Sequence, residues 1–196
     1  MGAEPTVLPD MRTVYAFILI SLDGYHADAA GTTEWFVDDP EFDAFARGQG
    51  ERIDTIVMGR KTFELMASYW PTPEGIADDP VIAAFMNDLP KVVASRTLTS
   101  HEWGPTTFVA DDVAGHVARL KDAPGKEIAV FGSSSLVAQL LPTGVIDELR
   151  IAVAPVVLGA GEPLLGGTPG PVRLEPLGVE SIGRSVLLTY RPVPAA

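Results

Sequence analysis

Three short segments of the chain place glycines, cations and hydroxyl groups directly after apolar runs. Their residues are, in chain order, Gly59, Arg60, Lys61 and Thr62, then Ser95 and Arg96, then Gly132, Ser133, Ser134, Ser135 and Leu136. Cationic and hydroxyl side chains bind phosphate oxygens, and the free backbone N–H groups at the start of a helix do the same. Together the segments predict a site for an anionic ligand such as a dinucleotide.

Each segment, taken alone, also has a simpler structural explanation. Glycines serve tight turns, adjacent cations commonly face solvent on a helix, and serines commonly cap helices. The occurrence of all three segments in one chain, each at the end of a predicted strand, favours a binding site over three unrelated features.

Familiar catalytic and phosphate-binding motifs do not account for these segments. The run that begins at Gly159 lacks the third glycine of a dinucleotide fingerprint, because Leu164 stands there. The residues before Gly59 lack the glycine that opens a P-loop. The serines after Gly132 do not form a nucleophile elbow, since Leu136 occupies the position of the last glycine.

The composition limits the partners and the chemistry. Fourteen basic against 26 acidic residues give a net charge of −12, which repels nucleic acid and anionic membranes. The longest apolar stretch, residues 14–20, is far below the roughly 20 residues of a membrane span. The chain has no cysteine, and His26, His101 and His116 share no ligand spacing, so no metal site is expected. Redox chemistry would therefore come from a bound cofactor.

Short β-branched runs alternate with amphipathic stretches, which is typical of an α/β domain. Strands are predicted at residues 14–21, 55–59, 91–94, 106–109, 127–131, 148–155, 173–178 and 185–190. Helices are predicted to begin at Asp39-Pro40, at Asp79-Pro80, at Asp111-Asp112 and at residues 133–135, because Asp and Ser cap helices and proline suits the first turn. No helix separates the last two strands, so we expect a C-terminal antiparallel hairpin in a mostly parallel mixed sheet flanked by helices.

The chain length of 196 residues suits one domain, which we expect to span residues 1–196 with a flexible tail at residues 1–12. Residues 1–10 have neither the basic start nor the apolar run of a signal peptide, so we expect a cytoplasmic location. The Gly- and Pro-rich stretches at residues 69–79 and 159–171 are interpreted as ordered loops.

Several motifs follow one another in a characteristic order. They are residues 20–24, then Gly31 with Glu34-Trp35, then residues 58–64, Ser95-Arg96, residues 130–134, and residues 144–150 leading into residues 154–159. In order and spacing they resemble the dihydrofolate reductase-like fold, and within it the RibD C-terminal domain family of riboflavin-biosynthesis reductases. The resemblance covers residues 14–190, nearly the whole chain.

The resemblance implies that the three segments bind NADPH. Residues 59–62 would contact the diphosphate and the adenosine phosphates. Ser95 and Arg96 would contact the 2′-phosphate that distinguishes NADPH from NADH. Residues 132–136 would wrap the diphosphate from the other side. A chain of net charge −12 that binds a polyanion needs its cations concentrated in this way.

The resemblance also implies that the loop after the first strand lies over the nicotinamide and the substrate. Asp23 and Trp35 become the catalytic candidates, and the substrate-binding candidates are Asp23, Gly24, Glu34, Trp35 and Glu41. Asp-Gly is also a common turn, and a tryptophan also suits a core. Glu41 and Asp43 lie roughly where dihydrofolate reductases carry the carboxylate that pairs with a pterin, although acids also suit a helix start.

The implied activity is reduction of 5-amino-6-(5-phosphoribosylamino)uracil to its ribitylamino counterpart, by hydride transfer from NADPH to the ribosyl carbon. Residues 64–79 hold no lysine or arginine, which does not favour a phosphorylated substrate. The family also implies a homodimer, with contacts at residues 147–158 and the terminal strands. Two alternatives remain open: a reductase of a pterin or other small molecule on the same fold, and a nucleotide-binding module without catalytic activity.

Overall fold

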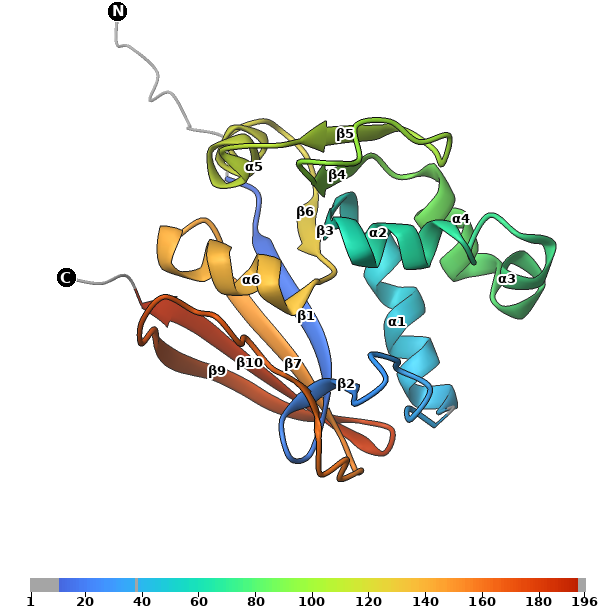
Figure 1. Ribbon diagram of the computed structural model, residues 1–196, viewed down its shortest axis with the longest axis vertical. Helices are drawn as coiled ribbons and strands as arrows, with labels where there is room; N and C mark the ends of the chain where they lie inside the picture. Colours follow the sequence, from blue (N-terminus) through green and yellow to red (C-terminus); the bar gives the residue numbers. More distant parts are fainter. Residues whose placement is uncertain (1–10, 38, 194–196) are drawn as a thin grey trace, which may run out of the picture.

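The computed structural model describes residues 11–37 and 39–193. Over these residues the chain forms an eight-stranded sheet in the order β5-β4-β3-β6-β1-β7-β10-β9 and a separate two-stranded sheet, β2-β8 (Figure 1). The strands are β1 (Val14–Ser21), β2 (Tyr25–Asp28), β3 (Ile53–Gly59), β4 (Lys91–Ala94), β5 (Thr106–Val109), β6 (Glu127–Val130), β7 (Glu148–Ala154), β8 (Gly161–Pro163), β9 (Arg173–Ile182) and β10 (Ser185–Val193). The helices are α1 (Pro40–Arg52), α2 (Arg60–Ala67), α3 (Pro73–Asp78), α4 (Pro80–Asp88), α5 (Val113–Lys121) and α6 (Ser134–Leu140), with a short 3-10 turn at Leu141–Thr143.

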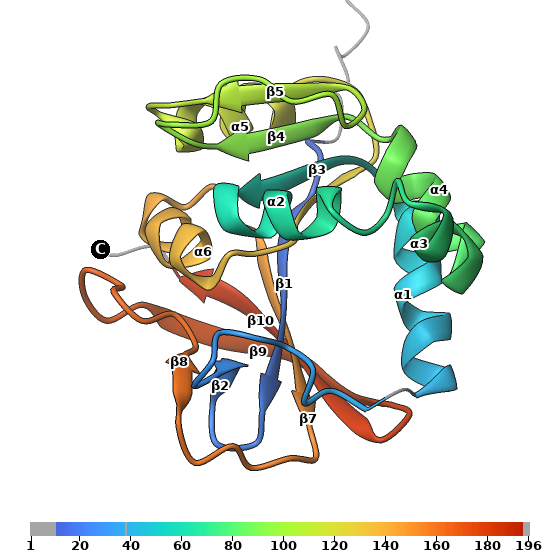
Figure 2. The same ribbon diagram turned by 45° about the vertical axis from the view of Figure 1, so that its right-hand side comes forward.

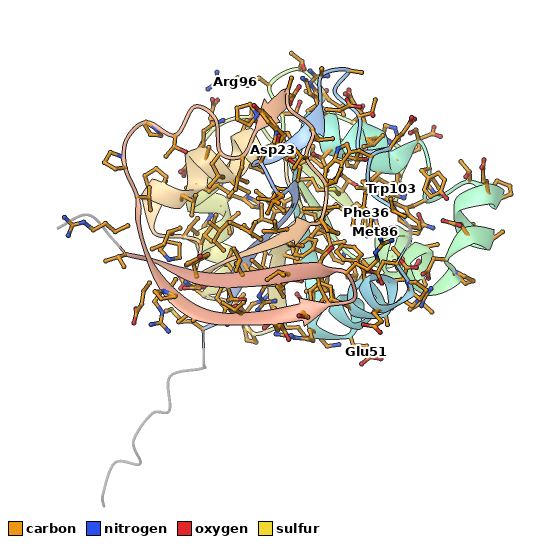
Figure 3. The ribbon with its side chains drawn as sticks, turned by 90° about the horizontal axis from the view of Figure 1, so that it is seen from below. Asp23, Phe36, Glu51, Met86, Arg96 and Trp103 are labelled. Carbon is orange, nitrogen blue, oxygen red and sulfur yellow. The ribbon has the colours of Figure 1, made fainter. Side chains whose placement is uncertain are left out.

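The main sheet is mixed, as the sequence predicts. Neighbouring strands from β5 to β7 pair in parallel, whereas β10 runs antiparallel to both β7 and β9. The predicted C-terminal hairpin is therefore confirmed, although β9 and β10 extend to residues 182 and 193. Figure 3, seen from below, shows the two strands of this hairpin running across the near side of the molecule.

The central strand β1 is apolar on both faces because helices cover both sides of the sheet. Tyr15 packs in a cluster with Phe63 of α2, and Ala16 packs in a second cluster with Val117 of α5 and Leu136 of α6. Figure 1 shows α1 and α2 on one side of β1 and α5 and α6 on the other, and Figure 2 shows α1 and α6 on opposite sides of β1. Strands buried on both faces appear in the sequence as continuous rather than alternating apolar runs, which is the pattern of residues 14–20.

The predicted helix starts are confirmed, and side-chain caps explain three of them. The Asp39 side chain accepts from the N–H groups of Glu41 and Phe42, at the start of α1. Asp79 caps α4 and Asp112 caps α5 in the same way. An aspartate at this position accepts backbone N–H groups that have no partner within the helix.

Two stretches that the sequence suggests are loops contain regular structure. Residues 69–79 include α3, which begins with Thr72 as its cap and Pro73 in its first turn. Residues 159–171 include β8, which pairs with β2 from the other end of the sequence. Neither element has the apolar periodicity that would reveal it in the sequence.

Part of the expected flexible tail, residues 1–10, lies outside the described residues. Arg12, also assigned to that tail, is buried and pairs with Asp54, while its Nε donates to the Lys126 carbonyl at 2.6 Å. A buried guanidinium with these partners is held in place, so the tail does not extend to Arg12. In the part of the chain that the structure describes, no helix is long and apolar enough to cross a membrane.

Candidate cofactor site at the ends of the parallel strands

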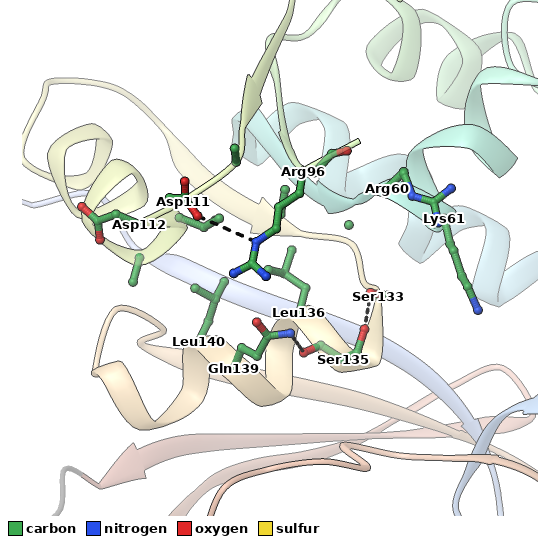
Figure 4. Close-up of a pocket in the computed structure, with 16 residues that line it drawn as sticks. Arg60, Lys61, Arg96, Asp111, Asp112, Ser133, Ser135, Leu136, Gln139 and Leu140 are labelled. Carbon is green, nitrogen blue, oxygen red and sulfur yellow. Dashed lines mark hydrogen bonds and ion pairs between the residues drawn. The ribbon is translucent and has the colours of Figure 1, made fainter. Parts of the chain in front are cut away.

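A pocket of about 500 Å³ lies where β3, β4, β5 and β6 end and α2, α5 and α6 begin. In a parallel sheet the carboxyl ends of neighbouring strands meet at one edge, where open α/β sheets bind their ligands. The predicted cofactor-binding residues that line the pocket are Gly59, Arg60, Lys61, Ser95, Arg96, Ser133, Ser135 and Leu136. The structure thus brings together all three segments that the sequence singles out, as Figure 4 shows.

Gly59 lets the ends of β3 and β6 meet closely. Its N–H donates to the Gly132 carbonyl at 3.1 Å, and a Cβ at this position would lie 2.7 Å from the Ser133 Oγ. Gly132 has a φ of +73°, in the left-handed region that favours glycine. The two glycines therefore serve the close approach of two strand ends at the pocket.

The start of α2 offers backbone donors to the pocket. Gly59 is its N-cap residue and makes no side-chain capping bond, so the first N–H groups of the helix have no capping side chain. Arg60 and Lys61 occupy the first turn and line the pocket. Free N–H groups, the positive end of the helix dipole and two cations together favour a phosphate.

Two of the cations that line the pocket, Arg60 and Arg96, have acidic partners. Arg60 pairs with Glu64 one turn along α2, at 2.9 Å. The Arg96 Nε lies 3.7 Å from the Asp111 Oδ1, as the dashed line in Figure 4 shows. The sequence predicts only a helix start at Asp111 and Asp112, yet both line the pocket. An anion entering here meets cations that already have acidic neighbours.

The rest of the wall is apolar, with one amide. It consists of Ala94, Ala110, Val113, Ala114, Leu140 and Gln139. Gln139 is a residue that sequence reasoning missed, although its position four residues after Ser135 places both on one face of α6. Its Nε2 donates to the Ser135 carbonyl at 3.0 Å (Figure 4). Apolar side chains beside phosphate-binding groups can accommodate a nucleoside base.

Three of the predicted cofactor-binding residues do not line this pocket. Ser134 is buried, and its Oγ accepts from the Leu165 N–H at 2.6 Å, so it holds the loop after β8. Gly132 and Thr62 lie side by side, because a Cβ on Gly132 would be 3.5 Å from the Thr62 Oγ1. These residues lie after the end of β6 and at the starts of α6 and α2, outside the lining of the pocket.

Ser95 lines the pocket but also shapes the turn that carries Arg96. Its Oγ accepts from the N–H groups of Thr97 at 3.2 Å and Leu98 at 2.8 Å. A hydroxyl that accepts twice keeps its own proton free to donate to a ligand. Ser95 therefore fixes the turn and retains one donor toward the pocket.

Asp23, the first catalytic candidate, connects two loops. Its carboxylate accepts from the Ser21 Oγ at 2.7 Å and from the N–H groups of Leu158 at 3.1 Å and Gly159 at 2.7 Å. The hydrogen bond from Ser21 is the largest cause that lowers the pKa of Asp23, and the backbone N–H groups of Leu158 and Gly159 lower it further. The adjacent Gly24 has a φ of +88°, as the predicted turn requires. The carboxylate is thus an ionised acceptor that joins the loop after β1 to the loop after β7.

Trp35, the second catalytic candidate, lies beside the end of β7. It lines a small second pocket of about 60 Å³ together with Ala154, Pro155 and Arg184. Its indole Nε1 is buried and has no hydrogen-bond partner. An unpaired buried donor is costly, so the substrate-binding role of Trp35 stays a prediction that a bound acceptor at this nitrogen would test.

The other acidic candidates belong to the same stretch before and within α1. Glu34 and Glu41 are exposed, whereas Asp43 is half-buried in the first turn of the helix. None of the three lines the pocket at the ends of the parallel strands. Among the described residues, no group of three or more His, Asp or Glu side chains could hold a metal ion.

Comparison with known proteins identifies the family of the chain. The model of the RibD C-terminal domain family matches residues 12–188. The uncharacterized protein YyaP of Bacillus subtilis (strain 168) is 33% identical over 155 residues, which are 78% of this chain and 80% of YyaP.

Solved structures show the same fold. A putative riboflavin biosynthesis protein from Shewanella sp. PV-4 is 26% identical, with a TM-score of 0.66 over 92% of this chain and 99% of that chain. Dihydrofolate reductase from Enterococcus faecalis, complexed with NADP(H), is 16% identical, with a TM-score of 0.57 over 92% of this chain and 96% of that chain. The mixed sheet is thus dihydrofolate reductase-like, and the chain belongs to the RibD C-terminal domain family.

Proposed function

We propose that the protein is an NADPH-dependent reductase that transfers hydride to a small acceptor linked to a heterocycle, as 5-amino-6-(5-phosphoribosylamino)uracil reductase does. The observation that carries the proposal is the pocket in which the start of α2, Arg96 and an apolar wall meet. The Enterococcus dihydrofolate reductase of the same fold is complexed with NADP(H), which supports a nicotinamide cofactor here.

The residues of the pocket fit the adenosine and phosphate half of such a cofactor. Arg60, Lys61 and Arg96 supply cations, the start of α2 supplies N–H donors, and the apolar wall suits a base. A bound NADPH would supply the hydride, which leaves the protein to bind and orient both reactants and to exclude water. Asp23 contributes by fixing the loop after β1 against the loop after β7.

The segment between the start of α2 and α4 does not favour a phosphorylated substrate. The segment from Glu64 to Asp79, which includes most of α2 and all of α3, holds no lysine or arginine. The cations Arg60, Lys61 and Arg96 belong to the proposed cofactor site. A phosphorylated substrate would need further cations, as anionic ligands of an acidic protein do.

The first test of the proposed function is cofactor binding. A ligand that binds the native state raises the thermal midpoint as its concentration passes the dissociation constant. We expect NADPH to raise the midpoint at lower concentration than NADH, and a panel of heterocyclic acceptors to be reduced with oxidation of NADPH. Binding without turnover of any acceptor would favour the alternative of an inactive nucleotide-binding module, whereas no binding at millimolar ligand would contradict the proposal.

Replacing Arg96 by alanine should weaken NADPH binding by about 10- to 100-fold and change NADH binding by less than about threefold. A guanidinium that binds a phosphate contributes roughly 1.5–3 kcal/mol, and only NADPH carries the 2′-phosphate. The measurement is a fluorescence titration with each cofactor. Arg191→Ala, which removes an exposed cation from the C-terminal hairpin, is the control. Equal losses for the two cofactors would overturn the assignment of Arg96.

We further propose that two copies of the chain associate through β9. This strand lies at the edge of the sheet, and its residues from Arg173 to Ser181 are exposed, with Leu174, Leu177 and Val179 among them. An exposed edge strand with a row of apolar side chains is a ready surface for association.

Replacing Val179, which is 71% exposed on β9, by glutamate should shift the protein from dimer to monomer at micromolar concentration. A buried charge without a partner opposes association because its desolvation is not compensated. Sedimentation velocity measures the shift. Val81→Glu adds the same charge at an exposed position of α4 and should leave the dimer intact. A wild-type protein that sediments only as a monomer would contradict the proposal.

A further inference from the structure

The pairing of β4 with β5 places an acid beside the proposed 2′-phosphate ligand Arg96. Ala94 and Val109, the last residues of the two strands, lie opposite each other. Arg96 and Asp111 each follow two residues later, and their side chains lie 3.7 Å apart at the edge of the pocket (Figure 4). Both side chains are more than four-fifths exposed, so a ligand can reach either of them.

Asp111 differs from the other acids near the pocket because it has no structural task among the described contacts. Asp112 accepts from the Gly115 N–H at 3.0 Å and caps α5. Glu64 makes two hydrogen bonds to the Nη1 of Arg60 within α2. Among the described residues, the Asp111 side chain forms an ion pair with Arg96.

Asp111 and Arg96 have opposite preferences for the adenosine ribose of a dinucleotide. A carboxylate accepts hydrogen bonds from the ribose hydroxyls of NADH, whereas an arginine near the same position accommodates the 2′-phosphate of NADPH. A carboxylate beside the arginine also repels that phosphate and competes with it for the guanidinium. This pocket therefore combines a group that favours NADPH with one that opposes it.

We propose that Asp111 is a specificity-determining residue: it competes with the 2′-phosphate for Arg96 and so limits the preference of the protein for NADPH over NADH. The inference rests on the proposed function, because it concerns the same cofactor site. With Asp111 present, the dissociation constants for NADPH and NADH should differ by less than they would with Arg96 alone.

The test is the variant Asp111→Asn, which keeps the size of the side chain and removes its charge. We expect the dissociation constant for NADPH to fall by about 5- to 10-fold and the constant for NADH to stay within about twofold or to rise. This improvement in NADPH binding should be smaller at higher ionic strength, because salt screens exposed charges. Fluorescence titration of the purified protein with each cofactor measures both constants without requiring a substrate.

Two further variants test whether the change in NADPH binding comes from competition for Arg96. Glu102→Gln makes the same change of net charge at an exposed residue outside the pocket and should alter neither constant. In an Arg96→Ala background, Asp111→Asn should improve NADPH binding by less than about threefold, because the cation for which the two anions compete is gone. A full gain in that background, or an equal change for both cofactors, would overturn the inference.

The same titrations separate the inference from the proposed function. If the wild-type protein binds neither cofactor, the proposed reductase and this inference both fail. If the wild-type protein binds them and Asp111→Asn leaves the ratio of the two constants unchanged, only the role of Asp111 fails. A ratio that moves toward NADPH in Asp111→Asn and not in Glu102→Gln supports the inference.

Discussion

Replacing Phe63 by alanine should lower the free energy of unfolding by about 3–5 kcal/mol, which is the usual cost of removing a phenyl ring from a packed core. Phe63 is fully buried on α2. Its ring lies 5.3 Å from that of Trp103, 5.6 Å from that of Phe108 and 5.1 Å from that of His101, measured between centroids. The alanine variant leaves a cavity among these rings. Urea unfolding followed by circular dichroism measures the loss.

The same substitution should also weaken cofactor binding, because Phe63 anchors the helix whose first turn carries Arg60 and Lys61. Leu65→Ala is the matched control, since Leu65 lies on the same helix and is 56% exposed. The control should change stability by less than about 0.5 kcal/mol, as surface substitutions usually do. A loss below about 1 kcal/mol in Phe63→Ala would show that the ring does not hold α2 against the sheet.

The central strands can be predicted from the sequence because a buried strand requires a run of apolar residues. The strands at residues 14–21 and 91–94 have the predicted bounds and are mostly buried. The strand at residues 106–109 lies at the edge of the sheet and is not buried, and its β-branched and aromatic residues alone give the predicted bounds. The pair β2-β8 was not predictable in this way, because residues about 135 positions apart form it and neither strand has an alternating pattern. Tertiary pairing decides the structure of such short segments.

The helix α3 shows how the same residues can suggest two structures. Pro71, Pro73 and Gly75 favour a loop when each is considered alone. Thr72, however, accepts from the Gly75 N–H at 3.1 Å, and Pro73 occupies the first turn, where its missing N–H costs nothing. The capping bond explains why the segment is helical.

The sequence identifies most of the residues that line the candidate cofactor site, but it does not identify the acidic neighbour of Arg96. Strand ends followed by Gly59, Arg96 and Gly132 identify the edge of the sheet at which the pocket lies. The neighbour of Arg96 depends on which strand pairs with β4 and in which register, which sequence spacing does not determine. Asp111 becomes part of the site only once β5 lies beside β4.

The position of Asp23 illustrates a second limit of sequence reasoning. An Asp-Gly pair after a strand indicates a turn, and the resemblance to the family places it near the substrate. Its three hydrogen bonds to Ser21, Leu158 and Gly159 depend on a loop more than 130 residues away. These bonds join the loop after β1 to the loop after β7, and a catalytic role for this carboxylate stays a prediction.

Replacing Asp39 by alanine should lower the free energy of unfolding by about 2–4 kcal/mol at neutral pH. The carboxylate is buried and accepts from the N–H groups of Glu41 at 3.1 Å and Phe42 at 3.4 Å, which start α1. It also accepts from the Arg184 N–H at 2.6 Å, in the turn between β9 and β10. A lost helix cap costs about 0.5–2 kcal/mol, and an unpaired buried donor costs a further 1–3 kcal/mol.

Asp39→Asn provides the matched control because it keeps the size of the side chain and one carbonyl oxygen. The Oδ1 of Asp39 serves the two helix N–H groups, and the Oδ2 serves Arg184. The amide oxygen of asparagine can accept from either the helix N–H groups or the Arg184 N–H, but its NH₂ group then faces the other donor. The free energy of unfolding of Asp39→Asn should therefore lie between those of the wild type and Asp39→Ala. Equal losses for the two variants would show that the side-chain oxygens do not connect α1 to the hairpin.

The pH dependence of stability tests the same contact in a second way. The backbone N–H of Arg184, with those of Glu41 and Phe42, lowers the pKa of Asp39 in the folded state. The unfolded chain therefore binds this proton more readily, and stability falls as the pH drops below the ordinary aspartate range toward the lowered value. At pH 7 the wild-type protein should therefore have a higher free energy of unfolding than Asp39→Ala, and in acid this difference should shrink. Urea unfolding at each pH measures the difference. An advantage that is independent of pH would assign the stability to packing of the side chain and not to its charge.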